Sequence, residues 1–128
     1  MPKKIKKTYL ITGGTGFIGR NIAENLIKNG FKVVIFDNNF RGALKKLKSK
    51  KKVKFIKGDI RNRNLFFKSL KDINAVIHLA YINGTKNFYS NPNLVLDVAI
   101  KGLLNVLDGC VKYRINELHQ AQRSTRHH

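Results

Sequence analysis

A run of glycines near the N-terminus has the residue types and the spacing needed to bind phosphate. Gly13, Gly16 and Gly19 recur at every third position within Thr12–Gly19. The first would permit a tight turn, the second would let a pyrophosphate approach the backbone, and the third would let a following helix pack close to the preceding strand. The free N–H groups of the first helical turn would then face the phosphates. The P-loop pattern, with lysine and then serine or threonine after a longer spacing, does not fit this segment.

An acidic residue follows the glycines at a spacing typical of dinucleotide sites. Asp37 lies 18 residues after Gly19 and is followed by Asn38. Its carboxylate is placed to accept hydrogen bonds from an adenosine ribose, and its charge would repel a 2′-phosphate, which favours NAD over NADP. Arg41 and nearby lysines weaken this preference. A simple turn residue at the end of a strand is the alternative interpretation of Asp37.

Hydrophobic periodicity predicts elements that would hold these groups. Short apolar runs predict strands, and apolar residues at three- and four-residue spacing predict helices. The predicted strands are 8–12, 32–37, 53–57 and 75–80, and 115–118 is a candidate fifth. The predicted helices are 17–29, 62–70 and 92–113, with a short one around 43–48.

This alternation predicts an α/β fold with a parallel sheet, right-handed crossovers and helices on both faces. In such sheets ligands bind beyond the carboxyl ends of the strands. The segments of chemical interest all follow predicted strands there, namely 12–19, 37–38, 58–60 and 79–81. Their shared position supports a single binding site more strongly than any one motif does.

Composition limits the function classes. The chain has 128 residues, enough for one domain, and 26 Lys and Arg against 7 Asp and Glu give a formal net charge of +19. Solvated lysines explain this excess better than a nucleic-acid partner does, although a dense cluster lies at 45–57. No apolar run approaches the ~20 residues of a membrane helix. The single cysteine, Cys110, excludes an internal disulfide, and a cytoplasmic location is the default expectation.

Four segments in the same order and spacing resemble the extended short-chain dehydrogenases/reductases, in particular the NAD-dependent epimerases and dehydratases that act on nucleotide-sugars. They are Thr12–Gly19 (TGGTGFIG), Phe36–Gly42 (FDNNFRG), Gly58–Arg61 (GDIR) and Val76–Ala80 (VIHLA). The similarity covers about residues 7–118 and implies a Rossmann-type fold.

The resemblance also implies roles for individual residues. Asp59 would bind the adenine amino group and Ile60 would offer backbone contacts, although a helix-capping role for Asp59 is the alternative. The residues at 79–81 would line the channel beside the cofactor's ribose and pyrophosphate. His78 is expected to support its strand by a buried hydrogen bond rather than to do chemistry. The predicted cofactor-binding residues are Gly13, Gly16, Phe17, Ile18, Gly19, Asp37, Asn38, Asp59, Ile60, Leu79, Ala80 and Tyr81.

Two positions depart from the family's pattern. The family usually has alanine or glycine where Tyr81 stands, which could narrow the pocket. It usually has asparagine where Ala99 stands, so this chain lacks a polar group that helps to order the region near the active site.

The catalytic elements of the family are missing from the sequence. Relatives continue into a serine-rich strand and a Tyr-x-x-x-Lys helix, in which the tyrosine acts as acid or base in hydride transfer. No tyrosine here has lysine at the fourth position after it. We therefore expect a sheet truncated after four to five strands, an incomplete NAD(P)-binding domain over 1–118, and a polar, disordered tail over 119–128. No catalytic residue and no metal ligand is assigned.

These features favour the NAD-binding portion of a nucleotide-sugar epimerase or dehydratase. A full-length relative would interconvert or dehydrate a nucleotide-sugar through transient hydride transfer to NAD, and could form a homodimer. This chain alone is expected to bind cofactor without catalysis. The alternatives are a noncatalytic basic module that binds nucleotides or nucleic acid, and a fragment that is not stable by itself.

Overall fold

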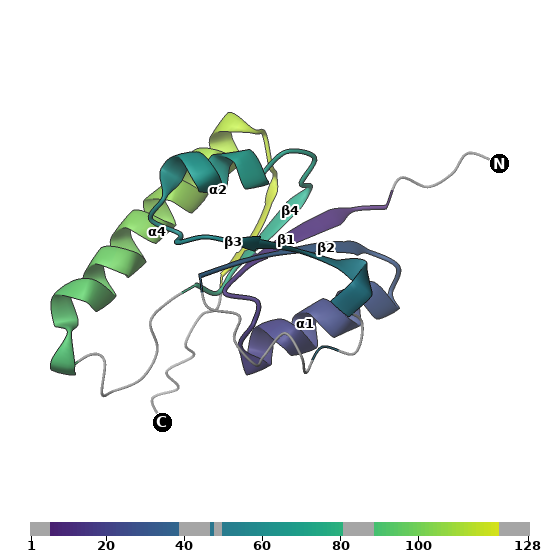
Figure 1. Ribbon diagram of the computed structural model, residues 1–128. Coiled ribbons are helices and arrows are strands. Elements are labelled where there is room, and N and C mark those ends of the chain that lie inside the picture. Colours follow the sequence, from purple (N-terminus) through teal and green to yellow (C-terminus); the bar gives the residue numbers. More distant parts are fainter. Residues whose placement is uncertain (1–5, 39–46, 48–49, 81–88, 121–128) are drawn as a thin grey trace, which may run out of the picture.

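The computed structural model describes residues 6–38, 47, 50–80 and 89–120, and within them the strands form one five-stranded parallel sheet (Figure 1). The strands are β1 (Thr8–Thr12), β2 (Lys32–Asp37), β3 (Val53–Lys57), β4 (Ala75–His78) and β5 (Glu117–Gln120). The helices are α1 (Phe17–Lys28), α2 (Arg63–Ser69) and α4 (Pro92–Lys112), and a 3-10 turn, η2, spans Lys50–Lys52.

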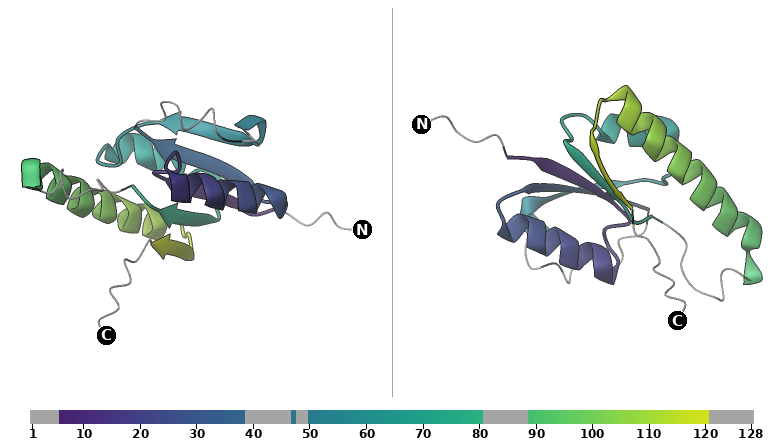
Figure 2. Two further views of the ribbon diagram at one scale, coloured as in Figure 1. Left: turned by 90° about the horizontal axis from the view of Figure 1, so that it is seen from below. Right: turned by 180° about the vertical axis from the view of Figure 1, so that it is seen from behind.

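The strand order is β3-β2-β1-β4-β5, so the first strand lies in the centre and the chain builds outward on each side of it. Figure 2 shows α1 on one face of the sheet and α2 and α4 on the other. The order reverses between β1 and β4, and ligands of such sheets bind at the carboxyl ends of the strands beside that reversal. The topology therefore places the end of β1 at the expected position of a binding site.

Each face of the sheet buries its own apolar cluster. The α2–α4 side contains Leu10, Phe36, Phe66 and Val106, all at most 1% exposed. The rings of Phe36 and Phe66 meet edge to face at 5.4 Å, which joins β2 to α2. The α1 side is built on Ile11, Ala23, Val33, Ile35 and Ile77. Alternation of side chains along β1 and β2 thus supplies both cores.

Local capping fixes where the helices begin and end. The Asn62 side chain accepts a hydrogen bond from Leu65 N at 3.2 Å and so caps the start of α2. Pro92 occupies the first turn of α4, where a missing N–H costs little. At the other end of α4, Arg114 has a φ of 54° and Ile115 N donates to Cys110 O at 2.8 Å, so the helix stops and the chain turns toward β5.

The predicted fold class and the order of the elements are confirmed, with two corrections at strand ends. β4 ends at His78 rather than at residue 80. The last strand is Glu117–Gln120 rather than 115–118, because Ile115 is used to fill the core beneath α4 before pairing begins. His119 and Gln120, which we assigned to a disordered tail, pair with Ile77 and His78 of β4. The rest of the predicted tail, and almost all of the short helix expected around 43–48, lie outside the described residues.

Candidate functional site

A pocket of about 310 Å³ lies at the carboxyl ends of the central strands. Its walls come from the loops after β1, β2, β3 and β4, and from the first turns of α4. The lining residues are Gly13, Gly16, Phe36, Asp37, Asn38, Gly58, Asp59, Ile60, Arg61, Leu79, Ala80, Leu94 and Val98. The sheet therefore brings together segments that are far apart in the sequence, as the pattern of strand ends predicts.

The turn after β1 is closed by the backbone of two neighbouring strands. Gly13 has a φ of +70°, and its N–H donates to Phe36 O at 2.9 Å. A Cβ on Gly13 would lie 2.9 Å from the backbone of Ala80, which follows β4. Both the left-handed backbone and the close approach require glycine at this position.

The other two glycines of the motif have different surroundings. A Cβ on Gly19 would lie 2.6 Å from Gly14 Cα, so Gly19 lets α1 pack against the turn itself rather than against the strand as expected. Gly16 precedes α1, is exposed, and would place a Cβ no closer than 3.9 Å to Gly13 O. The fold therefore requires Gly19, whereas the space beside Gly16 is open for a ligand.

Phe17 and Ile18 present exposed side chains, with 73% and 63% of each accessible, and neither lines the pocket. They form the first turn of α1, where backbone N–H groups lack partners within the helix. Any contact that they make with a phosphate would therefore come from the backbone and not from their side chains.

Asp37 is held against the glycine turn. Its Oδ2 accepts a hydrogen bond from Thr15 Oγ1 at 2.7 Å and one from Thr15 N at 3.2 Å. Its backbone oxygen accepts from Gly58 N at 3.0 Å, which joins the ends of β2 and β3. These contacts hold the Asp37 carboxylate beside the glycine turn, and Asp37 lines the pocket together with the exposed Asn38.

Asp59 forms an ion pair and does not cap the next helix. The cap of α2 is Asn62, whereas both oxygens of Asp59 accept hydrogen bonds from Arg61. Arg61 also donates to Asp97 on α4 at 2.7 Å. The Arg61 guanidinium holds the pKa of each carboxyl below its usual range, and Lys101 adds to this effect at Asp97. Asp59 is therefore ionised at neutral pH.

The loop between Asp59 and Arg61 is also fixed from α4. Ile60 is 4% exposed, and its carbonyl oxygen accepts a hydrogen bond from the buried Asn105 Nδ2 at 2.9 Å. A Cβ on Gly102 would lie 2.9 Å from Ile60 Cγ2, so the helix approaches this loop closely. The Asp59–Ile60 segment is thus held at a defined position beside the pocket.

His78 has the supporting role that we expected. It is fully buried at the end of β4, and its Nδ1 lies 2.6 Å from Thr12 Oγ1. The same hydroxyl oxygen accepts from Leu79 N at 3.0 Å and from Ala80 N at 3.1 Å. Burial lowers the pKa of His78 to about 4, so the imidazole is neutral at physiological pH. Thr12 and His78 together fix the residues that line the pocket beyond β4.

Eight of the predicted residues line the pocket: Gly13, Gly16, Asp37, Asn38, Asp59, Ile60, Leu79 and Ala80. Tyr81 lies outside the described residues. Sequence reasoning missed the supporting roles of Thr12, Thr15, Arg61 and Asn105. The place of Arg61 in the GDIR segment could have indicated its role. Asn105 gives no such indication, because it contacts the loop only through the packing of α4 across it.

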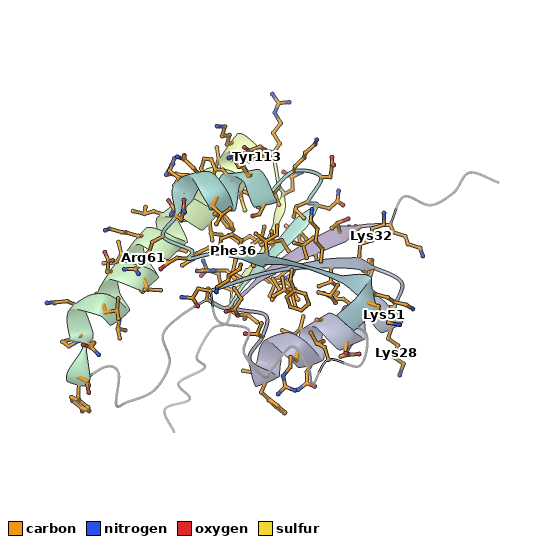
Figure 3. All side chains as sticks on the ribbon, in the orientation of Figure 1. Lys28, Lys32, Phe36, Lys51, Arg61 and Tyr113 are labelled. Carbon is orange, nitrogen blue, oxygen red and sulfur yellow. The ribbon has the colours of Figure 1, made fainter. Side chains whose placement is uncertain are left out.

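Within the described part of the chain, no lysine lines this pocket. Lys28, Lys32 and Lys51 lie toward the amino ends of the strands, at the opposite end of the sheet from the pocket (Figure 3). On the edge strand β3, Lys54 and Lys57 are exposed, where lysine discourages pairing with another chain. The positions of these five lysines therefore need no nucleic-acid partner to explain them, and a nucleic-acid interface is not favoured.

A family model described as the NAD dependent epimerase/dehydratase family matches residues 9–125. The chain belongs to this family. It is 36% identical over 115 residues to a CDP-paratose 2-epimerase of Salmonella typhi, which aligns with 84% of this chain and 33% of the relative.

Solved structures of the family agree with the fold. A UDP-glucose 4-epimerase from Bifidobacterium longum, in complex with NAD+ and UDP, superimposes with a TM-score of 0.85 at 26% identity, over 93% of this chain and 38% of that one. The UDP-glucose 4-epimerase of Thermus thermophilus, in complex with NAD, gives a TM-score of 0.78 at 30% identity, over 87% of this chain and 36% of that one. This member of the epimerase/dehydratase family thus spans about a third of the length of these relatives. Among residues 6–38, 50–80 and 89–120, no helix has the length and hydrophobicity that a membrane crossing needs.

Proposed function

We propose that this chain binds NAD in the pocket at the carboxyl ends of β1 to β4. The observation that carries the proposal is the arrangement of Asp37 beside the glycine turn, with Asp59 on another wall of the same pocket. A dinucleotide offers a diphosphate, a ribose and a base, and the residues that line this pocket include a candidate partner for each.

The diphosphate would lie against the first turn of α1. Gly16 leaves space beside the backbone, and the free N–H groups at the start of a helix favour an anion. Asp37 would then accept hydrogen bonds from the hydroxyls of the adenosine ribose. A phosphate on the 2′ position would meet that carboxylate and be repelled, so NAD is the preferred cofactor and NADP the weaker one.

The adenine would lie between the β3–α2 loop and α4. Leu94 and Val98 supply apolar contact from α4, and Asp59 with the backbone of Ile60 supplies polar groups. Leu79 and Ala80 would line the channel that leads toward the nicotinamide. Tyr81, which lies outside the described residues, remains a proposed cofactor-binding residue.

The activity of longer relatives belongs to the same proposal. We infer that a full-length relative interconverts or dehydrates a nucleotide-sugar, as an isomerase or lyase, with NAD accepting and returning a hydride. The described residues of this chain bind and orient the cofactor, and none of them is assigned a proton-transfer role in that reaction. We therefore propose that the chain by itself binds cofactor without turning over a nucleotide-sugar.

Two further parts of the proposal concern location and assembly. The single Cys110 allows no internal disulfide, which is consistent with the cytoplasm. A homodimer of full-length relatives is supported by apolar side chains on α4, since Leu96, Ile100, Leu104 and Leu107 are each at least 42% exposed. Detection in a membrane fraction, or a monomeric full-length relative on a sizing column, would contradict these two assignments respectively.

Calorimetric titration of the purified 128-residue chain with NAD and with NADP tests the function directly. We expect saturable binding of NAD and weaker binding of NADP. Absence of NAD binding at millimolar cofactor would remove the proposal. Turnover of UDP-glucose or a related nucleotide-sugar by this chain would contradict the claim that it lacks the catalytic groups.

A further inference from the structure

Arg61 joins two acidic residues from different elements, of which Asp59 lines the pocket. Its backbone N–H donates to Asp59 Oδ1 at 2.8 Å, and its Nη2 donates to Asp59 Oδ2 at 2.8 Å. Its Nη1 donates to Asp97 Oδ2 at 2.7 Å. Asp59 follows β3 and Asp97 lies on α4, so one side chain links the loop to the helix beside the pocket (Figure 3).

The contacts of Arg61 decide which part of the Asp59 carboxylate remains available. An ionised carboxylate can accept about four hydrogen bonds, two on each oxygen. Oδ1 receives the backbone N–H and Nε of Arg61, the latter at 3.1 Å, and Oδ2 receives Nη2, with Nε at a longer 3.3 Å. Among the hydrogen bonds of the described residues, the acceptor position least engaged is therefore on Oδ2.

The arrangement is rigid because Arg61 is itself held. Its side chain is 32% exposed and pairs with Asp97, which also pairs with Lys101 at 3.0 Å. A planar guanidinium that binds two carboxylates has little freedom to rotate, unlike a lysine ammonium. The orientation of the Asp59 carboxylate thus depends on the position of α4.

We propose that Arg61 is a positioning residue that determines which purine base the dinucleotide site accepts. The inference rests on the proposed binding of NAD. Arg61 holds Asp59 so that its remaining acceptor position meets the exocyclic amine of adenine. A base with an oxygen in place of that amine would present an acceptor to an ionised carboxylate and would be rejected.

The test compares NAD with its hypoxanthine analogue, deamino-NAD, which has an oxygen where adenine has the amine. We expect the full chain to bind NAD roughly 10- to 100-fold more tightly than deamino-NAD, as for a hydrogen bond to a charged group. In Arg61→Met the carboxylate loses its fixed orientation, and the preference should fall to within about threefold. The readout is a ratio of two affinities, which a general loss of stability would not change selectively.

Arg63→Met is the matched control. Arg63 also pairs with an acidic residue of α4, donating to Asp108 at 2.8 Å, but it does not line the pocket. This variant should keep the preference for NAD. If Arg61→Met does not fold, Asp97→Asn weakens only the pair between Arg61 and α4. This variant should also lower the preference for NAD over deamino-NAD.

The outcomes separate this inference from the proposed function. A preference for NAD that survives in Arg61→Met, or in Asp97→Asn where Arg61→Met is unfolded, would overturn the role of Arg61. Equal binding of NAD and deamino-NAD by the unmodified chain would also overturn it, while cofactor binding would stand. A chain that binds neither compound would overturn both proposals.

Discussion

The hydroxyl of Thr12 lies 2.6 Å from Nδ1 of His78, and this contact fixes the protonation of the buried imidazole. Thr12 Oγ1 already accepts hydrogen bonds from Leu79 N and Ala80 N. A hydroxyl has one proton to donate, so Thr12 donates to His78 and Nδ1 accepts. The proton of the neutral ring is therefore on Nε2. One side chain thus connects the end of β1, the end of β4 and the residues that line the pocket.

Replacing Thr12 by valine should destabilise the fold. Valine keeps the shape of threonine but leaves His78 Nδ1 and the Ala80 N–H without this hydroxyl. Loss of hydrogen bonds at a buried site costs about 2 kcal/mol, or roughly 5–10 °C in Tm for a domain of this size. Thermal and urea unfolding of Thr12→Val measure the effect, with Thr12→Ser as the control that keeps the hydroxyl. Equal stability of the valine and serine variants would contradict the assigned hydrogen bonds.

Protonation of His78 should destabilise the protein in mild acid. Burial lowers the pKa of His78 from its usual 6.5 to about 4, so between these values the unfolded chain binds the proton more readily. Stability from this group is fully present above pH ~6.5 and is lost as the pH falls toward about 4, by at most ~3 kcal/mol. Urea unfolding of the unmodified chain and of His78→Asn should show a stability difference that changes with pH across this range. A constant difference would exclude His78 as the cause.

Alanine substitutions at Gly16 and Gly19 should have different effects, the first on NAD binding and the second on thermal stability. A Cβ at Gly16 meets nothing within 3.9 Å, so Gly16→Ala should leave Tm nearly unchanged and weaken NAD binding about tenfold or more, because the methyl group occupies the space beside the diphosphate. A Cβ at Gly19 meets Gly14 Cα at 2.6 Å, so Gly19→Ala should lower Tm. Melting curves and NAD titrations of both variants check this. An unchanged affinity for NAD in Gly16→Ala would place the diphosphate elsewhere.

Asp37 should control the choice between NAD and NADP. Asp37→Asn keeps an oxygen for the Thr15 hydroxyl but removes the negative charge, so the preference for NAD over NADP should fall about tenfold or more. Asp72→Asn is a suitable control, because Asp72 is exposed in a turn before β4 and does not line the pocket. If both variants keep the original preference, the 2′-position does not face Asp37.

Much of the fold follows from local patterns that act within one segment. The apolar runs at β1 to β4 and the spacing of apolar residues in α1 predict those elements within a residue or two. The exceptions need contacts between distant segments. The sequence around Ile115 predicts the start of a strand, but the turn that ends α4 directs this side chain into the core. β5 begins two residues later and includes His119. A polar sequence can still form a strand when β4 supplies the pairing edge.

In the candidate site, too, local patterns identify some residues, whereas others are identified only by contacts between distant segments. The glycine turn, Asp37 and Asp59 are recognisable because each lies at a fixed place relative to its own strand. The groups that orient them are not local. Thr15 and Asp37 are 22 residues apart in the sequence, and Arg61 and Asp97 are 36 apart. No periodic pattern in the sequence indicates these pairs.

The most direct test of the central claim is to map NAD on the chain by amide chemical shifts. Titration of the isotope-labelled 128-residue protein with NAD should shift the amides of 13–19, 37–38, 59–61 and 79–80. The chemical shifts of the amides of Lys28, Lys32 and Lys51, toward the opposite end of the sheet, should not change. Shifts confined to those lysines, or no shifts at millimolar NAD, would contradict a dinucleotide site at the carboxyl ends of the strands.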